Sequence, residues 1–377
     1  MGRLISLLIL SFIIYISWPF ISDTEELSSV EDFKTEFQSL KDNPELSSAL
    51  EAVNNGLNQI IGQLNSTKEQ LTPNGQTDFP KVQKPDLETP AEQTFSIHNI
   101  EIGEAKNEVE NHLGNPQRVS VNEYGTQWHA YHEGFQNFIM VSYGKDNKVN
   151  GLYTNQDLIA SRNGISFGSS KETVRAEFGE PLTKIIKGLT HLQLQQGRDY
   201  DVYQQGGSYI TIFYDKHSNN SVTAIQLISE QLEQNKPGFY TKASEPLKEG
   251  LELQLFDLTN ASRVNNGLSI LKWDDRVRET ARKHSKDMAE NEYFNHTNLE
   301  GKSPFDRMAE DDIVFAVAGE NLAYGQFSSI FAHEGLMNSL GHRENILKPE
   351  FELLGVGVAF GNKSQPYFTE NFYTKRM

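Results

Sequence analysis

The sequence of 377 residues contains no cysteine. This absence excludes disulfide bonds, thiol catalysis and zinc sites built on cysteine. Basic residues are also scarce relative to acidic ones, and the formal net charge is -17. Nucleic-acid binding requires a clustered basic face, which the sequence lacks, so we expect no nucleic acid as a partner.

A long apolar run occupies residues 4–21, with Arg3 before it and Asp23 after it. About 20 apolar residues suffice to span a bilayer core, and the positive flank remains inside. The run predicts a signal anchor in residues 1–22 that attaches the chain to the membrane. A cleaved signal peptide is the alternative, although no Ala-x-Ala-like site follows. Both the signal anchor and the cleaved signal peptide place the rest of the chain outside the cytoplasm, either secreted or on the extracellular face of the membrane.

Residues 23–94 predict a stalk. Apolar residues recur at helical spacing between Leu46 and Leu64, and four prolines follow between residues 71 and 93. The proline-containing part cannot build a core and is expected to be extended.

A repeat at an offset of 65 residues defines the next domain, residues 95–235, with copies at about 98–160 and 163–230. Gly114 and Gly179, each two residues before a proline, are expected to end a helix in each copy. Strands are predicted near residues 126–131, 137–143 and 149–153, and again near 200–204, 209–214 and 222–227. The matching positions are Gly103, Lys106, Val109, Leu113, Gly114 and Pro116, then Gly168, Lys171, Val174, Phe178, Gly179 and Pro181.

Residues 247–377 predict a C-terminal domain of the α+β class, because helices come first and strands last. One helix is expected to end near Asn266 and another to cover residues 273–291. A third begins at Pro304 after the N-cap Ser303, and a fourth covers residues 328–339. Two strands, 353–360 and 367–373, should form a hairpin.

The candidate site is the stretch from Phe294 to Arg343. His296, Glu320 and His342 lie in or beside turn-forming sequence there, so their polar ends can converge on one cleft. Two imidazoles and a carboxylate suit zinc or another divalent cation, with Glu320 as candidate base. They equally suit a polar cleft in which a carboxylate orients an imidazole. The nearby His333 begins an incomplete His-Glu-x-x-His pattern and is expected to be an exposed helix residue.

Several short stretches together resemble the bacterial branch of the CAP superfamily, the cysteine-rich secretory, antigen five and pathogenesis-related proteins (SCP domain). The resemblance covers roughly residues 250–374, and the region before it resembles the CAP-associated N-terminal domain. The resemblance implies an α-β-α sandwich with a central cleft. The stretches are Leu258-Thr259-Asn260, Arg263, Leu271, Trp273, Phe294-Asn295-His296, Gly319-Glu320-Asn321, Asn338-Ser339, Gly341-His342-Arg343, Asn345-Ile346-Leu347, Gly355, Gly357 and Tyr367-Phe368-Thr369-Glu370-Asn371-Phe372.

By this resemblance His296 and His342 are the two cleft histidines and candidate metal ligands, and Glu320 is the cleft acid. The family's fourth cleft residue is a glutamate, but Ser339 stands at that position here. Glu334 lies five residues earlier, which is about 140° around the helix, so it cannot replace the missing acid.

Three functions remain open. The first is a membrane-anchored extracellular protein whose cleft binds a lipid, glycan, peptide or divalent cation at the cell envelope. The second is a metal-assisted, peptidase-like hydrolase that uses His296, His342 and Glu320. The third is a structural spacer of the cell envelope.

Overall fold

The structure, a computed structural model, describes residues 81–236 and 238–376. The predicted signal anchor and the stalk as far as residue 80 lie outside these residues. Within them, no helix combines the length and the apolar character that crossing a membrane requires. The described end of the stalk, residues 81–94, contains no helix or strand, and the backbone N–H groups of Val82 and Glu88 donate to Gln136 and Asn99.

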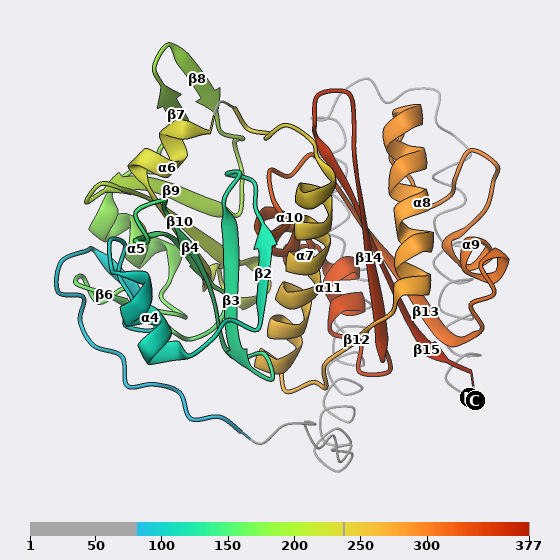
Figure 1. Ribbon diagram of the computed structural model, residues 1–377, viewed down its shortest axis with the longest axis horizontal. Coiled ribbons are helices and arrows are strands. Elements are labelled where there is room, and N and C mark those ends of the chain that lie inside the picture. Colours follow the sequence, from blue (N-terminus) through green and yellow to red (C-terminus); the bar gives the residue numbers. More distant parts are fainter. Residues whose placement is uncertain (1–80, 237, 377) are drawn as a thin grey trace, which may run out of the picture. The chain divides into compact units, whose positions relative to one another are not determined.

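A seven-stranded antiparallel sheet forms the centre of the N-terminal domain, in the order β2-β3-β4-β5-β11-β10-β9 (Figure 1). Two-stranded pairs, β1 with β6 and β7 with β8, flank it. The elements are β1 Phe95–Ile97, α4 Lys106–Leu113, β2 Arg118–Val121, β3 Gln127–Glu133, β4 Gln136–Tyr143, β5 Val149–Thr154, β6 Ile159–Ser161, α5 Lys171–Phe178, β7 Lys184–Lys187, β8 Thr190–Gln193, β9 Tyr200–Gln205, β10 Ser208–Asp215, β11 Ser221–Ser229 and α6 Glu230–Asn235.

The six predicted strands of this domain correspond to β3, β4, β5, β9, β10 and β11. The predicted helix ends are also confirmed: Gly114 follows α4 with φ 77° and Gly179 follows α5 with φ 74°. These positive φ values suit glycine because it has no Cβ. The hairpin of β7 and β8 was not predicted.

The C-terminal domain is a four-stranded sheet, in the order β12-β14-β15-β13, between two layers of helices (Figure 1). Thr369 of β15 bonds Ser285 of α8, whereas the next residue, Glu370, bonds Thr259 of α7, so these helices cover opposite faces. This is the α-β-α sandwich that the resemblance implied. The elements are α7 Glu245–Asn265, β12 Lys272–Trp273, α8 Asp275–Asn291, α9 Pro304–Glu310, β13 Phe315–Tyr324, α10 Ser329–Asn338, α11 Leu340–Ile346, β14 Leu353–Phe360 and β15 Pro366–Lys375.

Helix α7 lies between the two sheets, so the domains share one hydrophobic core. Leu251 and Leu255 of α7 belong to the same buried cluster as Trp128 and Met140 of the first sheet and Phe368 of the second. Buried apolar area is the main stabilising contribution in folded proteins, so we expect the two domains to unfold together.

Two local predictions at the candidate site are wrong. Glu320 lies in the middle of strand β13, not in a turn. His342 lies in the short helix α11, which the sequence analysis did not predict. The glycine and asparagine on either side of Glu320 imitate a turn signal, but backbone pairing with β15 determines the conformation there.

A glycine of α7 tests the contact between the domains. A Cβ at Gly250 would lie 2.0 Å from the carbonyl oxygen of Val121 in β2. We expect Gly250→Ala to lower the free energy of unfolding by about 1–3 kcal/mol through overpacking. Gly335→Ala in α10, with no atom within 4 Å of its added Cβ, is the matched control. It should raise stability by about 0.5–1 kcal/mol. Urea unfolding of both variants measures the difference, and equal stability would contradict the close contact.

Candidate functional site

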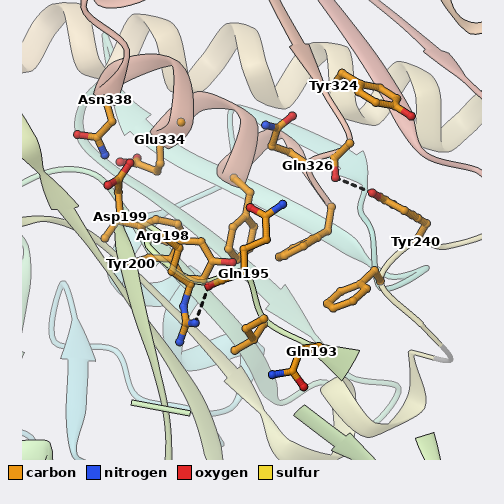
Figure 2. Close-up of a pocket in the computed structure, with 17 residues that line it drawn as sticks. Gln193, Gln195, Arg198, Asp199, Tyr200, Tyr240, Tyr324, Gln326, Glu334 and Asn338 are labelled. Carbon is orange, nitrogen blue, oxygen red and sulfur yellow. Dashed lines mark hydrogen bonds between the residues drawn. The ribbon is translucent and has the colours of Figure 1, made fainter. Parts of the chain in front are cut away.

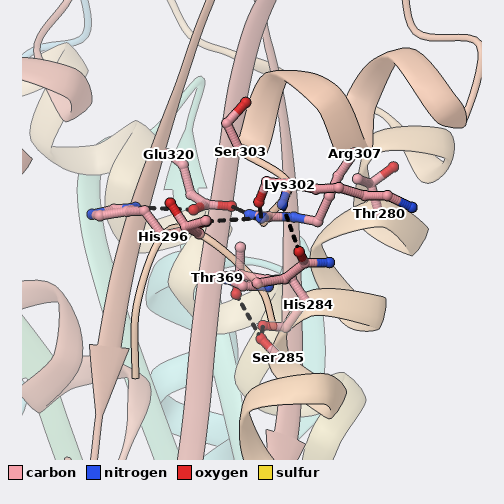
Figure 3. Close-up of polar contacts among 12 residues, drawn as sticks. Thr280, His284, Ser285, His296, Lys302, Ser303, Arg307, Glu320 and Thr369 are labelled. Atoms are coloured by element: carbon pink, nitrogen blue, oxygen red, sulfur yellow. Dashed lines mark hydrogen bonds and ion pairs between the residues drawn. The ribbon is translucent and has the colours of Figure 1, made fainter. Parts of the chain in front are cut away.

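The first pair of the candidate site is built around Glu320, on the face of β13 that turns toward α8 and α9. Its Oε1 lies 2.9 Å from Nδ1 of His296, and its Oε2 accepts from Nη2 of Arg307 at 2.6 Å (Figure 3). The Glu320 side chain is only 1% exposed, whereas that of His296 is 50% exposed. Both carboxylate oxygens of Glu320 are therefore engaged inside the protein, and the imidazole extends into solvent.

This contact determines which nitrogen of His296 remains free. A carboxylate only accepts hydrogen bonds, so Nδ1 of His296 carries the hydrogen and donates it to Glu320. In the neutral ring Nε2 is then an acceptor with no partner among the described residues. Arg307 also donates from Nη1 to the backbone oxygens of His296 at 2.8 Å and Lys302 at 3.0 Å. One guanidinium thus fixes both the carboxylate and the loop that carries the imidazole.

Arg307 was not among the predicted site residues. Its signal in the sequence is the capping box of Ser303 and Asp306, which starts α9 and places Arg307 one turn inside it. The first turn of α9 follows the His296 loop, so a buried arginine there was a candidate partner for Glu320.

The second pair of the candidate site contains His342. Its Nδ1 lies 2.8 Å from Oγ of Ser339, and its backbone oxygen accepts from Asn321 at 3.2 Å. Burial lowers the pKa of His342, and the charge of His296 lowers it further. Both effects favour the neutral imidazole of His342, and the second shows that the two imidazoles are close enough to interact. The structure brings the four predicted residues together as two pairs, His296 with Glu320 and His342 with Ser339.

The arrangement does not fit a three-ligand zinc site. Within residues 81–236 and 238–376, no three His, Asp or Glu side chains are grouped so as to hold a metal ion. Glu320 already uses both oxygens, and the guanidinium of Arg307 adds a positive charge beside it that opposes a cation. Two imidazoles alone make a weak chelator.

The predictions for His333 and Glu334 have different outcomes. His333 was expected to be exposed but is completely buried, with Nε2 2.7 Å from Oγ of Ser262 in α7. Glu334 does not join the cleft, as the helix geometry predicted. Its Oε1 accepts from the hydroxyl of Tyr153 in β5 at 2.7 Å, so it faces the N-terminal domain. Sequence analysis missed the burial of His333 because α7 and the N-terminal sheet cover this side of α10.

The comparisons with known proteins agree with the fold. A family model described as CAP-associated N-terminal matches residues 102–239, and one described as cysteine-rich secretory protein family matches residues 256–372. A relative named "Uncharacterized membrane protein YlbC" from Bacillus subtilis is 29% identical over 288 residues, covering 72% of this chain and 82% of the relative.

Two further comparisons cover one or both domains. The protein named "Uncharacterized protein YkwD" from Bacillus subtilis is 40% identical over 124 residues, which is 33% of this chain and 47% of that protein. A crystal structure of an extracellular protein containing an SCP domain from Bacillus anthracis is 25% identical, with a TM-score of 0.64. The structural match covers 79% of this chain and 100% of the chain from Bacillus anthracis.

The fold and the two family matches define a two-domain protein in which an SCP domain follows a CAP-associated domain. The chain therefore combines a CAP-associated N-terminal domain with a domain of the cysteine-rich secretory protein family, and it contains no cysteine.

The buried carboxyl of Glu334 predicts a pH dependence of stability. Burial raises its pKa from 4.5 to about 7. Between these values the folded state binds more protons than the unfolded state, so the stabilisation is complete below about pH 4.5 and is lost as the pH rises through about 7. Glu334→Gln keeps an acceptor for Tyr153 and removes the titration. We expect the variant to gain roughly 2–3 kcal/mol relative to the wild type between pH 5 and 8. Urea unfolding across this range measures it, and parallel pH profiles would contradict it.

Proposed function

We propose that this protein is a membrane-associated, extracellular CAP protein whose cleft binds a ligand through the imidazoles of His296 and His342. The observation that carries the proposal is that both oxygens of Glu320 are engaged, by His296 and by Arg307. The carboxylate therefore orients a ring, and the ring nitrogen Nε2 is the polar atom left for a ligand.

The chemistry around the imidazoles favours a ligand with hydroxyl or N–H groups. Because Nδ1 of His296 donates to Glu320, Nε2 is the ring atom that can accept a hydrogen bond, and a glycan hydroxyl or a peptide N–H can donate one. The aromatic rings of Phe294 and Tyr324 lie close by in the chain, are 48% and 42% exposed, and have centroids 5.8 Å apart. Exposed aromatic rings suit the apolar faces of glycans and peptides. A lipid chain offers no donor to Nε2, so glycan or peptide is favoured over lipid.

The hydrolase hypothesis has less support. A general base must have a free oxygen in reach of the water it activates. The oxygens of Glu320 bond to His296 and Arg307, and the Glu320 side chain is almost fully buried. Ser339 adds a neutral hydroxyl where a second acid is expected from the resemblance.

The spacer hypothesis is also weakened by the packing. A spacer requires the N-terminal domain to hold the C-terminal domain at a distance. Instead, Trp128 of β3 and Leu255 of α7 belong to one buried cluster. The N-terminal domain therefore supports the structure that carries the cleft.

The proposal also includes attachment to the membrane and an origin of the N-terminal domain by duplication. The apolar run in residues 4–21 supports attachment, and the name of the relative YlbC agrees with it. Duplication is supported by the repeat offset of 65 residues and by the sheet order, in which β2 to β5 form one half and β9 to β11 the other.

The NMR signals of the histidine rings test whether the proposed cleft binds a ligand. In full-length protein with labelled histidine rings, muropeptides released from bacterial cell wall are expected to shift the signals of His296 and His342, because their Nε2 atoms are free. His191, an exposed imidazole on β8, serves as the internal control. His342→Ala should weaken the response of His296 about tenfold, which corresponds to one or two lost hydrogen bonds.

The same samples separate binding from hydrolysis. If the muropeptides remain intact by chromatography while the ring signals shift, the cleft binds without turnover. Products that form with the wild type and disappear with His296→Ala would establish the hydrolase instead. A shift of His191 alone would contradict both.

The mass of the mature protein tests the membrane anchor. We expect full-length protein purified from bacterial membranes to retain residues 1–22, because no small-residue cleavage site follows the apolar run. Intact mass spectrometry of the membrane and medium fractions measures this. A protein in the medium that begins near residue 23 would identify a cleaved signal peptide.

A further inference from the structure

A cavity of about 480 Å³ lies between the two domains, beside the linker that joins them. Its walls come from the end of the β7–β8 hairpin, from β9 and β10, from linker residues 239 and 240, and from α10 with the connection before it (Figure 2). The volume is within the range of about 300–1,000 Å³ that is typical of small-molecule sites. His296, Glu320, Ser339 and His342 do not line it, although Tyr324 does, so the cavity is distinct from the histidine pairs.

Aromatic rings form a continuous wall of the cavity. The ring centroids of Phe239 and Phe327 are 5.2 Å apart with an interplanar angle of 15°, and those of Phe327 and Phe331 are 4.4 Å apart. Phe331 in turn meets Tyr200 of β9 at 5.1 Å and 78°. The rings belong to the linker, the C-terminal domain and the N-terminal domain. The wall therefore exists only while the two domains are in contact.

Polar side chains from three different elements also surround the cavity. Gln195 follows the β7–β8 hairpin, Gln326 follows β13 and Glu334 belongs to α10 (Figure 2). Oε1 of Gln326 and Nε of Arg198 are buried and have no hydrogen-bond partner in the described part of the chain.

The cavity carries little net charge. Asp199 lines the cavity and forms an ion pair at 2.9 Å with Lys216, which lies outside the lining. Burial raises the pKa of Glu334 to about 7, so this carboxyl is partly protonated at neutral pH and can donate as well as accept. Arg198 is the remaining cation, and its Nη1 already donates to the backbone oxygen of Gln195 at 2.9 Å. The lining therefore combines one cation, one paired carboxylate and one partly protonated carboxyl.

We propose that this cavity binds a neutral saccharide. A sugar ring has a face of C–H groups that packs against the electron-rich face of an aromatic ring. Its hydroxyls both donate and accept hydrogen bonds, as do the amides of Gln195 and Gln326. A lipid chain would leave these amides without partners, and an anionic ligand would lie beside Glu334.

Binding at this position has a structural consequence. The ligand contacts both domains and the linker, but the complete wall is absent from the unfolded chain. Ligand that binds only the folded state raises its stability in proportion to the logarithm of ligand concentration. Occupancy of the cavity therefore strengthens the contact between the domains.

The test uses full-length protein in detergent and a soluble tetramer of N-acetylglucosamine as probe, measured by isothermal titration calorimetry. We expect saturable binding to the wild type and about tenfold weaker binding to the Gln195→Ala/Gln326→Ala double variant, a loss of ~1.4 kcal/mol. Gln231→Ala, which removes an exposed amide of α6 outside the cavity, is the matched control and should bind like the wild type. The probe should also raise the unfolding temperature of the wild type more than that of the double variant.

The His296→Ala/His342→Ala variant separates this proposal from the cleft proposal. If the cavity is the site, this variant keeps the saturable binding that the double glutamine variant loses, and any tetramer that the cleft also binds is a second binding event that this variant lacks. Loss of binding in this variant alone would assign the saccharide to the cleft and overturn the proposal. Unchanged binding in the double glutamine variant, or no saturation at up to about 5 mM probe, would also overturn it. A neutral tetrapeptide that binds where the saccharide does not would contradict the ligand class.

Discussion

The burial of α7 between two sheets is the constraint on which the rest of the structure depends. A helix covered on both sides has no polar face in water, so each polar side chain it buries needs a partner. Glu252 is fully buried and accepts from Arg278 and Arg282 of α8 and from the backbone of Val358. Asp257, on the other side, pairs with Arg118 of β2 at 2.8 Å. These contacts attach α7 to both domains.

The cleft is connected to α7 by a series of buried hydrogen bonds. Thr259 of α7 donates to Glu370 of β15, which accepts from Asn321 of β13 at 3.1 Å. Asn321 also donates to the backbone oxygen of His342. Burial raises the pKa of Glu370 to about 7. The next residue back along β13, Glu320, points to the opposite face of the sheet and holds His296. The alternation of side chains along this edge strand therefore connects it to His296 on one face of the sheet and to His342 on the other.

Local signals allowed much of the fold to be predicted from the sequence, whereas the site needed tertiary information. Helix N-caps such as Ser303 and helix-ending glycines such as Gly114 act within a few residues. The structure has both where they were expected. Gly319 was misread because its role is not local. A Cβ there would lie 2.9 Å from the ring of Phe351, so glycine permits close packing in a strand and forms no turn. Arg307 and His333 were missed for the same reason, since their partners are distant in the sequence.

Helix α10 belongs to both proposed sites, which explains the unusual residue at its end. Glu334 lines the cavity between the domains, and Ser339, five residues later, holds the imidazole of His342. Five residues turn a helix by about 140° beyond one full turn, so one residue faces the N-terminal domain while the other faces the cleft. The carboxyl at position 334 contributes to the contact with Tyr153 and cannot reach His342. The cleft therefore has one carboxylate and one hydroxyl as imidazole partners, a chemistry suited to orienting two rings for a ligand.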